Sequence, residues 1–195
     1  RENNIPEWFI ESCKKISYLF PRAHAVAYVM MAFRIAWFKV YHPLAFYAAY
    51  FSIRAKAFDL RIMTGGLKTQ LTEFNRIKAL DRAASPKDKD LMSALEVSME
   101  MYQRGYRFIN VDIQHSEARR FSIKDGALLP PFLAIDSLGE TVADAIVEER
   151  NERPFTSLKD LQRRCKVSNT IIDLMKDLKC CGELPEDEQM SLFGA

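Results

Sequence analysis

Residues 135–146 read IDSLGETVADAI, and the expected architecture follows from this stretch. An apolar, a small and a second apolar residue come before Gly139, and beyond two polar residues apolar side chains recur at helical spacing. A glycine directly before a helix lets a phosphate approach the free N–H groups at the helix start, where the helix dipole also favours negative charge. The stretch therefore predicts a tight hairpin that leads into a phosphate-binding helix.

A second copy of this arrangement follows further along the chain. It consists of a helix over residues 157–165, the hairpin KVSN at 166–169 and a helix from Thr170. The two copies predict a tandem helix-hairpin-helix region over residues 131–183, which holds the backbone of duplex DNA without reading its sequence. The candidate DNA-binding residues lie in the two hairpins: Ser137, Gly139, Glu140, Thr141, Lys166, Ser168 and Asn169.

The charge of this region leaves an alternative open. Residues 133–182 hold 8 basic and 9 acidic side chains, which is not the basic balance of an autonomous DNA-binding domain. Contact through backbone amides tolerates a neutral surface, and the second copy gathers the basic residues Lys159, Arg163, Arg164 and Lys166. The alternative is an ordinary packing unit of four helices with a glycine turn.

The composition of the whole chain is that of a folded protein. Of its 195 residues 48% are apolar and 28% are charged, which excludes a disordered tail. The net charge of +2 divides into +7 for residues 1–83 and −5 for residues 84–195, and the basic part suggests a polyanionic partner. The four cysteines show no paired spacing, so we expect reduced thiols, no metal site and a cytoplasmic protein. Because the chain starts at Arg1, we expect a fragment of a longer protein.

The fold class expected is mainly α. The apolar run over residues 23–38 predicts a buried helix and not a membrane span, because charged residues interrupt it and Pro43 follows it. Pro43 suits the first turn of a second helix, whose buried stripe would be Phe46, Tyr50 and Ile53. A third helix is expected after Gly65-Gly66.

In the middle of the chain the spacing of apolar residues changes from helical to alternating. Ser85 and Pro86 predict the capped start of a helix that continues to Gly105. Apolar residues then recur at roughly every second position in residues 107–113, 120–123 and 127–129. The turn Lys124-Asp125-Gly126 lies between the last two of these segments. We expect a small β element between the helical regions.

The approach to the first long helix offers a candidate nucleotide site. Arg22 at the helix start, with His24 and Tyr28 one turn apart, could present a cation, a hydrogen-bonding ring and a flat aromatic to a nucleotide. A histidine that simply satisfies its hydrogen bonds in a protein core is the alternative.

The C-terminal sequence differs from the acidic stretch before it. Gln189-Met190-Ser191-Leu192-Phe193 is typical of a linear peptide that places two large apolar side chains in a groove, with the glutamine as a polar anchor. It matches the pentapeptide by which replication proteins bind the bacterial sliding clamp. The alternative is that this end folds back on the last helix.

Residues 18–51, YLFPRAHAVAYVMMAFRIAWFKVYHPLAFYAAYF, resemble the fingers of the bacterial replicative DNA polymerase III alpha subunit. Leu129-Pro130-Pro131-Phe132 and the C-terminal clamp motif make the chain similar to the PolC type. The resemblance implies that Tyr18 and His24 lie beside the incoming dNTP, with Arg22 near its phosphates and Tyr28 one turn further along.

The resemblance also implies a division of labour along the chain. Residues 1–83 would be fingers, 84–130 a connecting region with a long helix and the β element, 131–183 the duplex-binding region and 184–195 a flexible tail. The implied partners are primer-template DNA, dNTP, the β sliding clamp and the remainder of the polymerase, with no membrane. Mg²⁺ would be held by palm aspartates of the full enzyme, so the fragment alone should be inactive. A non-catalytic DNA-binding and clamp-binding accessory or repair module is the alternative.

Overall fold

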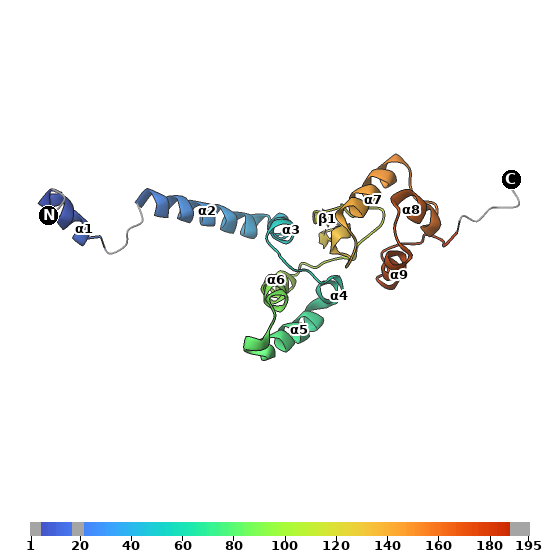
Figure 1. The fold of residues 1–195 in the computed structure, drawn as a ribbon, viewed down its shortest axis with the longest axis horizontal. Coiled ribbons are helices and arrows are strands. Elements are labelled where there is room, and N and C mark those ends of the chain that lie inside the picture. The colour runs from blue at the N-terminus through green and yellow to red at the C-terminus, as the bar shows by residue number, and fades with distance from the viewer. Residues whose placement is uncertain (1–4, 17–21, 188–195) are drawn as a thin grey trace, which may run out of the picture. The chain divides into compact units, whose positions relative to one another are not determined.

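A computed structural model describes residues 5–16 and 22–187 (Figure 1). The chain divides into two compact units, residues 1–41 and 42–195. The described part of the first unit consists of α1 (Glu7–Lys14) and α2 (Arg22–Tyr41). The first of these helices was not expected from the sequence, and neither contains a buried residue.

The expectation of a buried helix over residues 23–38 is half right. The helix forms, but the structure leaves its side chains exposed, including Phe33 (73% exposed) and Val29 (67%). Its apolar residues lie on all sides, and a helix that is apolar all round needs cover on every face. Among the described residues, α2 is the one helix whose length and composition would suffice to cross a membrane.

The second unit begins with a helical core built from α3 (Pro43–Ile53), α4 (Leu60–Thr64), α5 (Gly66–Leu80) and α6 (Pro86–Gln103). Pro43 stands in the first turn of α3, as expected. Of the predicted stripe, Phe46 and Tyr50 are partly buried against this core and Ile53 is 77% exposed, while the fully buried residues are their neighbours Tyr47 and Phe51. Tertiary packing decided this, since a helix that is apolar throughout offers several faces for burial.

Helices α5 and α6 pack against each other around a satisfied polar contact. The buried amide of Gln70 donates to the carbonyl of Met63 at 2.8 Å and accepts from the hydroxyl of Ser98 at 2.7 Å. At the start of α6, Ser85 and Asp88 form the reciprocal capping box, with Pro86 in the first turn. The cap predicted at Ser85 is confirmed.

The β element is the hairpin of β1 (Ser122–Lys124) and β2 (Ala127–Leu129), paired Ser122 to Leu129. Asp125 (φ 49°) and Gly126 (φ 73°) form the turn, because both positions require positive φ in the tight turns that match strand twist. The alternating residues 107–113 form no strand of their own. Phe108 makes one bridge to Leu128 and packs in the same core.

A second core lies under the turn η2 (Phe132–Ala134) and the helices α7 (Glu140–Glu152), α8 (Leu158–Cys165) and α9 (Asn169–Asp177). The segment around residue 112 closes this core, since the amide of Ile113 donates to the carbonyl of Cys180 at 3.2 Å. Cys165, Cys180 and Cys181 are buried free thiols, and burial raises the pKa of Cys165 and of Cys180 to about 12.

These cores divide the chain differently from the expected regions. Residues from Tyr47 to Leu128 share one core, which spans the boundary expected at residue 83. The compact units separate at residue 41, within the segment expected to form the fingers. The functional boundaries at 83, 130 and 183 therefore stay predictions.

Candidate nucleic-acid interface

The two expected hairpins have the same backbone course. Ser137 (φ 64°) and Lys166 (φ 54°) each adopt the left-handed conformation. Each is followed by a buried apolar residue, Leu138 or Val167, and then by the residue at the N-cap position of the next helix. Ser137 thus adopts a left-handed backbone conformation that glycine adopts without strain. For a residue with a side chain this conformation costs about 1 kcal/mol of conformational free energy.

Hairpin 1, residues 135–139, leads into α7 through Gly139. This residue has φ −75° and makes no side-chain cap, and a Cβ built on it meets nothing within 4 Å. The chain therefore does not need glycine here for its own conformation or packing. Ser137, Gly139, Glu140 and Thr141 are all exposed, so the amides at the start of α7 face a surface that an anion could reach.

Hairpin 2, residues 166–168, leads into α9 through Ser168. The hydroxyl of Ser168 accepts from the amide of Ile171 at 3.3 Å, which caps the helix. Asn169, the first residue of α9, accepts a hydrogen bond from Gln162 through its side chain. Lys166, Ser168 and Asn169 are exposed like their counterparts in hairpin 1.

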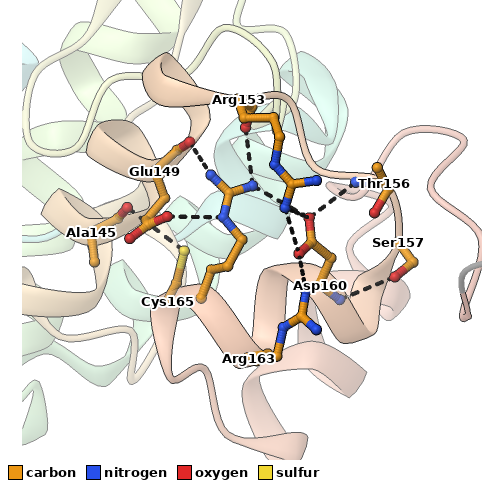
Figure 2. Close-up of polar contacts among 9 residues, drawn as sticks. Ala145, Glu149, Arg153, Thr156, Ser157, Asp160, Arg163 and Cys165 are labelled. Carbon is orange, nitrogen blue, oxygen red and sulfur yellow. Dashed lines mark hydrogen bonds and ion pairs between the residues drawn. The ribbon is translucent and has the colours of Figure 1, made fainter.

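Three of the four basic residues expected beside hairpin 2 form ion pairs, and of these three the side chain of Arg164 alone is largely buried. Asp160, whose side chain is fully buried, pairs with Arg163 at 2.9 Å, Arg153 at 3.2 Å and Arg164 at 3.3 Å (Figure 2). Burial alone would raise the pKa of Asp160, but the Thr156 amide and the arginines lower it below its usual value. The network joins the end of α7 to α8.

Arg164 is the central residue of this network, although its sequence position predicts a basic group at the surface of hairpin 2. Its side chain is only 12% exposed, and Nε donates to Glu149 at 2.9 Å. The guanidinium also donates to the carbonyl of Arg153 at 3.0 Å and lies 4.7 Å from the Phe155 ring centre. The spacing of Asp160 and Arg164, one helical turn apart, was the sequence signal for this role.

The described start of the expected flexible tail is attached to α8 and α9. The carbonyls of Pro185 and Glu186 accept from the first two amides of α8, at 2.9 and 3.3 Å. Glu186 pairs with Lys176 at 2.7 Å, and Asp187 pairs with Lys159. Residues 184–187 are thus tied to the helices and are not simply solvated. The clamp motif, Gln189 to Phe193, lies outside the described residues.

The candidate nucleotide site is described in part. Arg22 is the first residue of α2, and the rings of His24 and Tyr28 lie 4.5 Å apart with 60° between their planes. Tyr18 lies outside the described residues. The structure therefore brings two of the four predicted side chains into contact and places the third within the same first turns of α2.

The metal ions of the full enzyme were expected to be held by palm aspartates outside this chain. In the part of the chain that the structure describes, no cluster of three potential metal ligands occurs. The expectation that the chain holds no Asp-x-Asp pair is wrong, because Asp88 and Asp90 form one. Asp88 accepts from the amide and hydroxyl of Ser85, at 3.0 and 2.6 Å, so it serves as a helix cap.

The repeated hairpins of the second core are those of a helix-hairpin-helix motif. The family described as helix-hairpin-helix motif matches residues 105–189. The chain is 48% identical over 193 residues to PolC-type DNA polymerase III of Caldanaerobacter subterraneus subsp. tengcongensis, covering 99% of this chain and 14% of that protein. It is also 48% identical over 196 residues to PolC-type DNA polymerase III of Streptococcus pyogenes serotype M12 (strain MGAS2096), covering 99% of this chain and 13% of that protein.

These relatives confirm the resemblance that the sequence indicated. The chain is homologous over nearly its whole length to one segment of PolC-type DNA polymerase III, and it spans 13 to 14% of the length of these relatives. The start of the helix-hairpin-helix match at residue 105 agrees with the closing contact between Ile113 and Cys180, which joins both ends of the region.

Proposed function

We propose that this chain is the part of a replicative PolC-type DNA polymerase that binds the backbone of the primer-template duplex. One observation carries the proposal: two exposed hairpins of matching geometry, in a chain 48% identical over 99% of its length to PolC-type polymerases. Each hairpin directs the amides of a helix start toward solvent. A phosphate oxygen would accept from these amides, and the helix dipole would add to the attraction.

Such contacts explain why the region can bind DNA without a strongly basic surface. Backbone amides fix the position of a phosphate but carry no information about the base attached to it. Lys166 is exposed at hairpin 2, whereas Arg164 is held inside the fold. The binding would be independent of sequence and moderately sensitive to salt.

The first unit would serve the incoming nucleotide. Arg22 would approach the triphosphate, and His24 with Tyr28, together with Tyr18, would align the sugar and base. These residues would select and position dNTP, while bond making would rest on palm aspartates and Mg²⁺ in the remainder of the enzyme. That remainder would also cover the apolar surface of α2.

Gln189 to Phe193 would bind the β sliding clamp and tether the polymerase to DNA. Deletion of residues 189–193 should abolish binding to the clamp and leave duplex affinity unchanged, because the hairpins lie elsewhere. Surface plasmon resonance on immobilised clamp, with fluorescence anisotropy on a labelled duplex, measures both. Equal clamp affinity after the deletion would exclude this role for the peptide.

The main proposal is tested by titrating two labelled duplexes of unrelated sequence with the chain at several salt concentrations. We expect equal affinity for both duplexes and a linear fall of log K with log salt. A chain that binds neither duplex, or that discriminates strongly between them, contradicts the proposal.

A further inference from the structure

Arg119 lies beside hairpin 1 although it is 20 residues before Gly139 in the chain. The carbonyls of Glu117 and Ala118 accept from the amides of Phe132 and Leu133, at 2.9 and 3.1 Å. These bonds hold the segment against η2, which leads directly into hairpin 1. The backbone of Arg119 is therefore positioned by the same turn that positions the hairpin.

The side chain of Arg119 joins two carboxylates at the start of α7. Its Nε donates to Asp144 at 3.0 Å, and its two terminal nitrogens pair with Asp144 and Glu140. The guanidinium holds the pKa of Asp144 below its usual value. All three side chains are partly exposed, so the group lies on the surface that hairpin 1 presents.

These carboxylates lie where a phosphate would have to approach. Glu140 is the first residue of α7, directly after Gly139, and Asp144 is one turn further on. Without a cation, both charges would oppose an anion at the amides of the helix start. Hairpin 2 differs, because the corresponding positions hold the neutral Asn169 and a single carboxylate, Asp173.

We propose that Arg119 is a positioning residue of hairpin 1, which neutralises Glu140 and Asp144 so that the amides at the start of α7 can donate to a DNA phosphate. This inference rests on the proposed duplex binding. It assigns a DNA-binding role to a residue outside both hairpins. In hairpin 2 the positive charge comes from Lys166, which belongs to the hairpin. In hairpin 1 it comes from Arg119, which belongs to a separate segment of the chain.

A set of charge variants tests the proposal by duplex titration of the full chain at low salt. Arg119→Gln should weaken binding about fivefold, the effect of one uncompensated unit charge a few ångströms from a phosphate. Adding Glu140→Gln and Asp144→Asn to Arg119→Gln should restore affinity to the starting level or above it, because no carboxylate then needs compensation.

Arg120→Gln is the matched control, since it removes one positive charge from the neighbouring exposed residue. It should change affinity by less than about twofold. If Arg119→Gln has no effect, or if Arg120→Gln weakens binding equally, the proposal is wrong. If the triple variant stays as weak as Arg119→Gln, Arg119 contacts phosphate directly and the compensating role is excluded.

The same titrations separate this inference from the function on which it rests. If the unaltered chain fails to bind duplex, the proposed function and the inference both fail. If the unaltered chain binds and Lys166→Gln weakens it while Arg119→Gln does not, duplex binding stands and the role of Arg119 is refuted. Thermal unfolding of each variant checks that the fold is retained.

Discussion

Hairpin 1 and hairpin 2 share a backbone course but differ in how their helix starts are satisfied and charged. Gly139 leaves the start of α7 without a side-chain cap, whereas Ser168 caps α9. Hairpin 1 and the helix start after it hold Asp136, Glu140 and Asp144, whereas hairpin 2 and the helix start after it hold Lys166 and Asp173. Two hairpins of the same backbone geometry thus carry different local charges, so geometry and electrostatics vary separately between them.

Hairpin 1 should be the more sensitive of the two to added bulk. Gly139→Val should weaken duplex binding about tenfold, because the side chain would project where a phosphate must approach. The fold should tolerate it, since φ is −75° and a Cβ meets nothing within 4 Å. Anisotropy titration with a parallel thermal melt measures both effects.

Gly139→Ala is the graded control, with one methyl group in place of three carbons. It should weaken binding less than valine does. An unchanged salt-dependent binding curve for Gly139→Val would show that no phosphate lies close to this residue.

Hairpin 2 should depend more on its cap. Ser168→Ala removes the hydroxyl that accepts from Ile171 and should lower the free energy of unfolding by about 1 kcal/mol. Gly139→Ser in hairpin 1 should raise it by a few tenths of a kcal/mol, roughly the difference between these residues at a helix start. Urea unfolding followed by circular dichroism measures the two changes. Equal effects of opposite sign would mean that both helix starts are capped alike.

The smallest effect is expected from the single lysine of hairpin 2. Lys166→Gln should weaken duplex binding about threefold at moderate salt and reduce the slope of log K against log salt by about 1, if Lys166 meets one phosphate. Affinities for two duplexes of different sequence should fall equally. A loss confined to one duplex would indicate base contact, and the hairpins would then differ in kind.

The local elements of the second unit were predictable because neighbouring residues determine them. Ser85, Pro86 and Asp88 suffice for a helix start, and Asp125-Gly126 suffices for a β-turn. The left-handed residue, the buried residue and the helix start recur in both hairpins within a few positions of sequence. The predicted nucleotide site shares this local character, since His24 and Tyr28 meet across one helical turn.

Burial and charge pairing were less predictable because they join residues that are far apart in the sequence. The helix over residues 43–53 was expected, but packing chose Tyr47 and Phe51 for its buried face. Arg164 contacts Glu149, 15 positions away, and Lys159 contacts Asp187, 28 positions away. Arg164 is thereby withdrawn from the surface beside hairpin 2, whereas Lys159 and Arg163 stay exposed while they form ion pairs.

The sequence by itself determined the longer helices, the two hairpins and the similarity to PolC-type polymerases, because these depend on short-range backbone preferences and on residue identity. Only the tertiary structure decided which charges remain available to a partner. Asp160 gathers three arginines, residues 184–187 occupy the start of α8, and Arg119 reaches hairpin 1 from another segment. The physical reason is that an ion pair depends on distance in space, which chain folding sets and residue spacing does not.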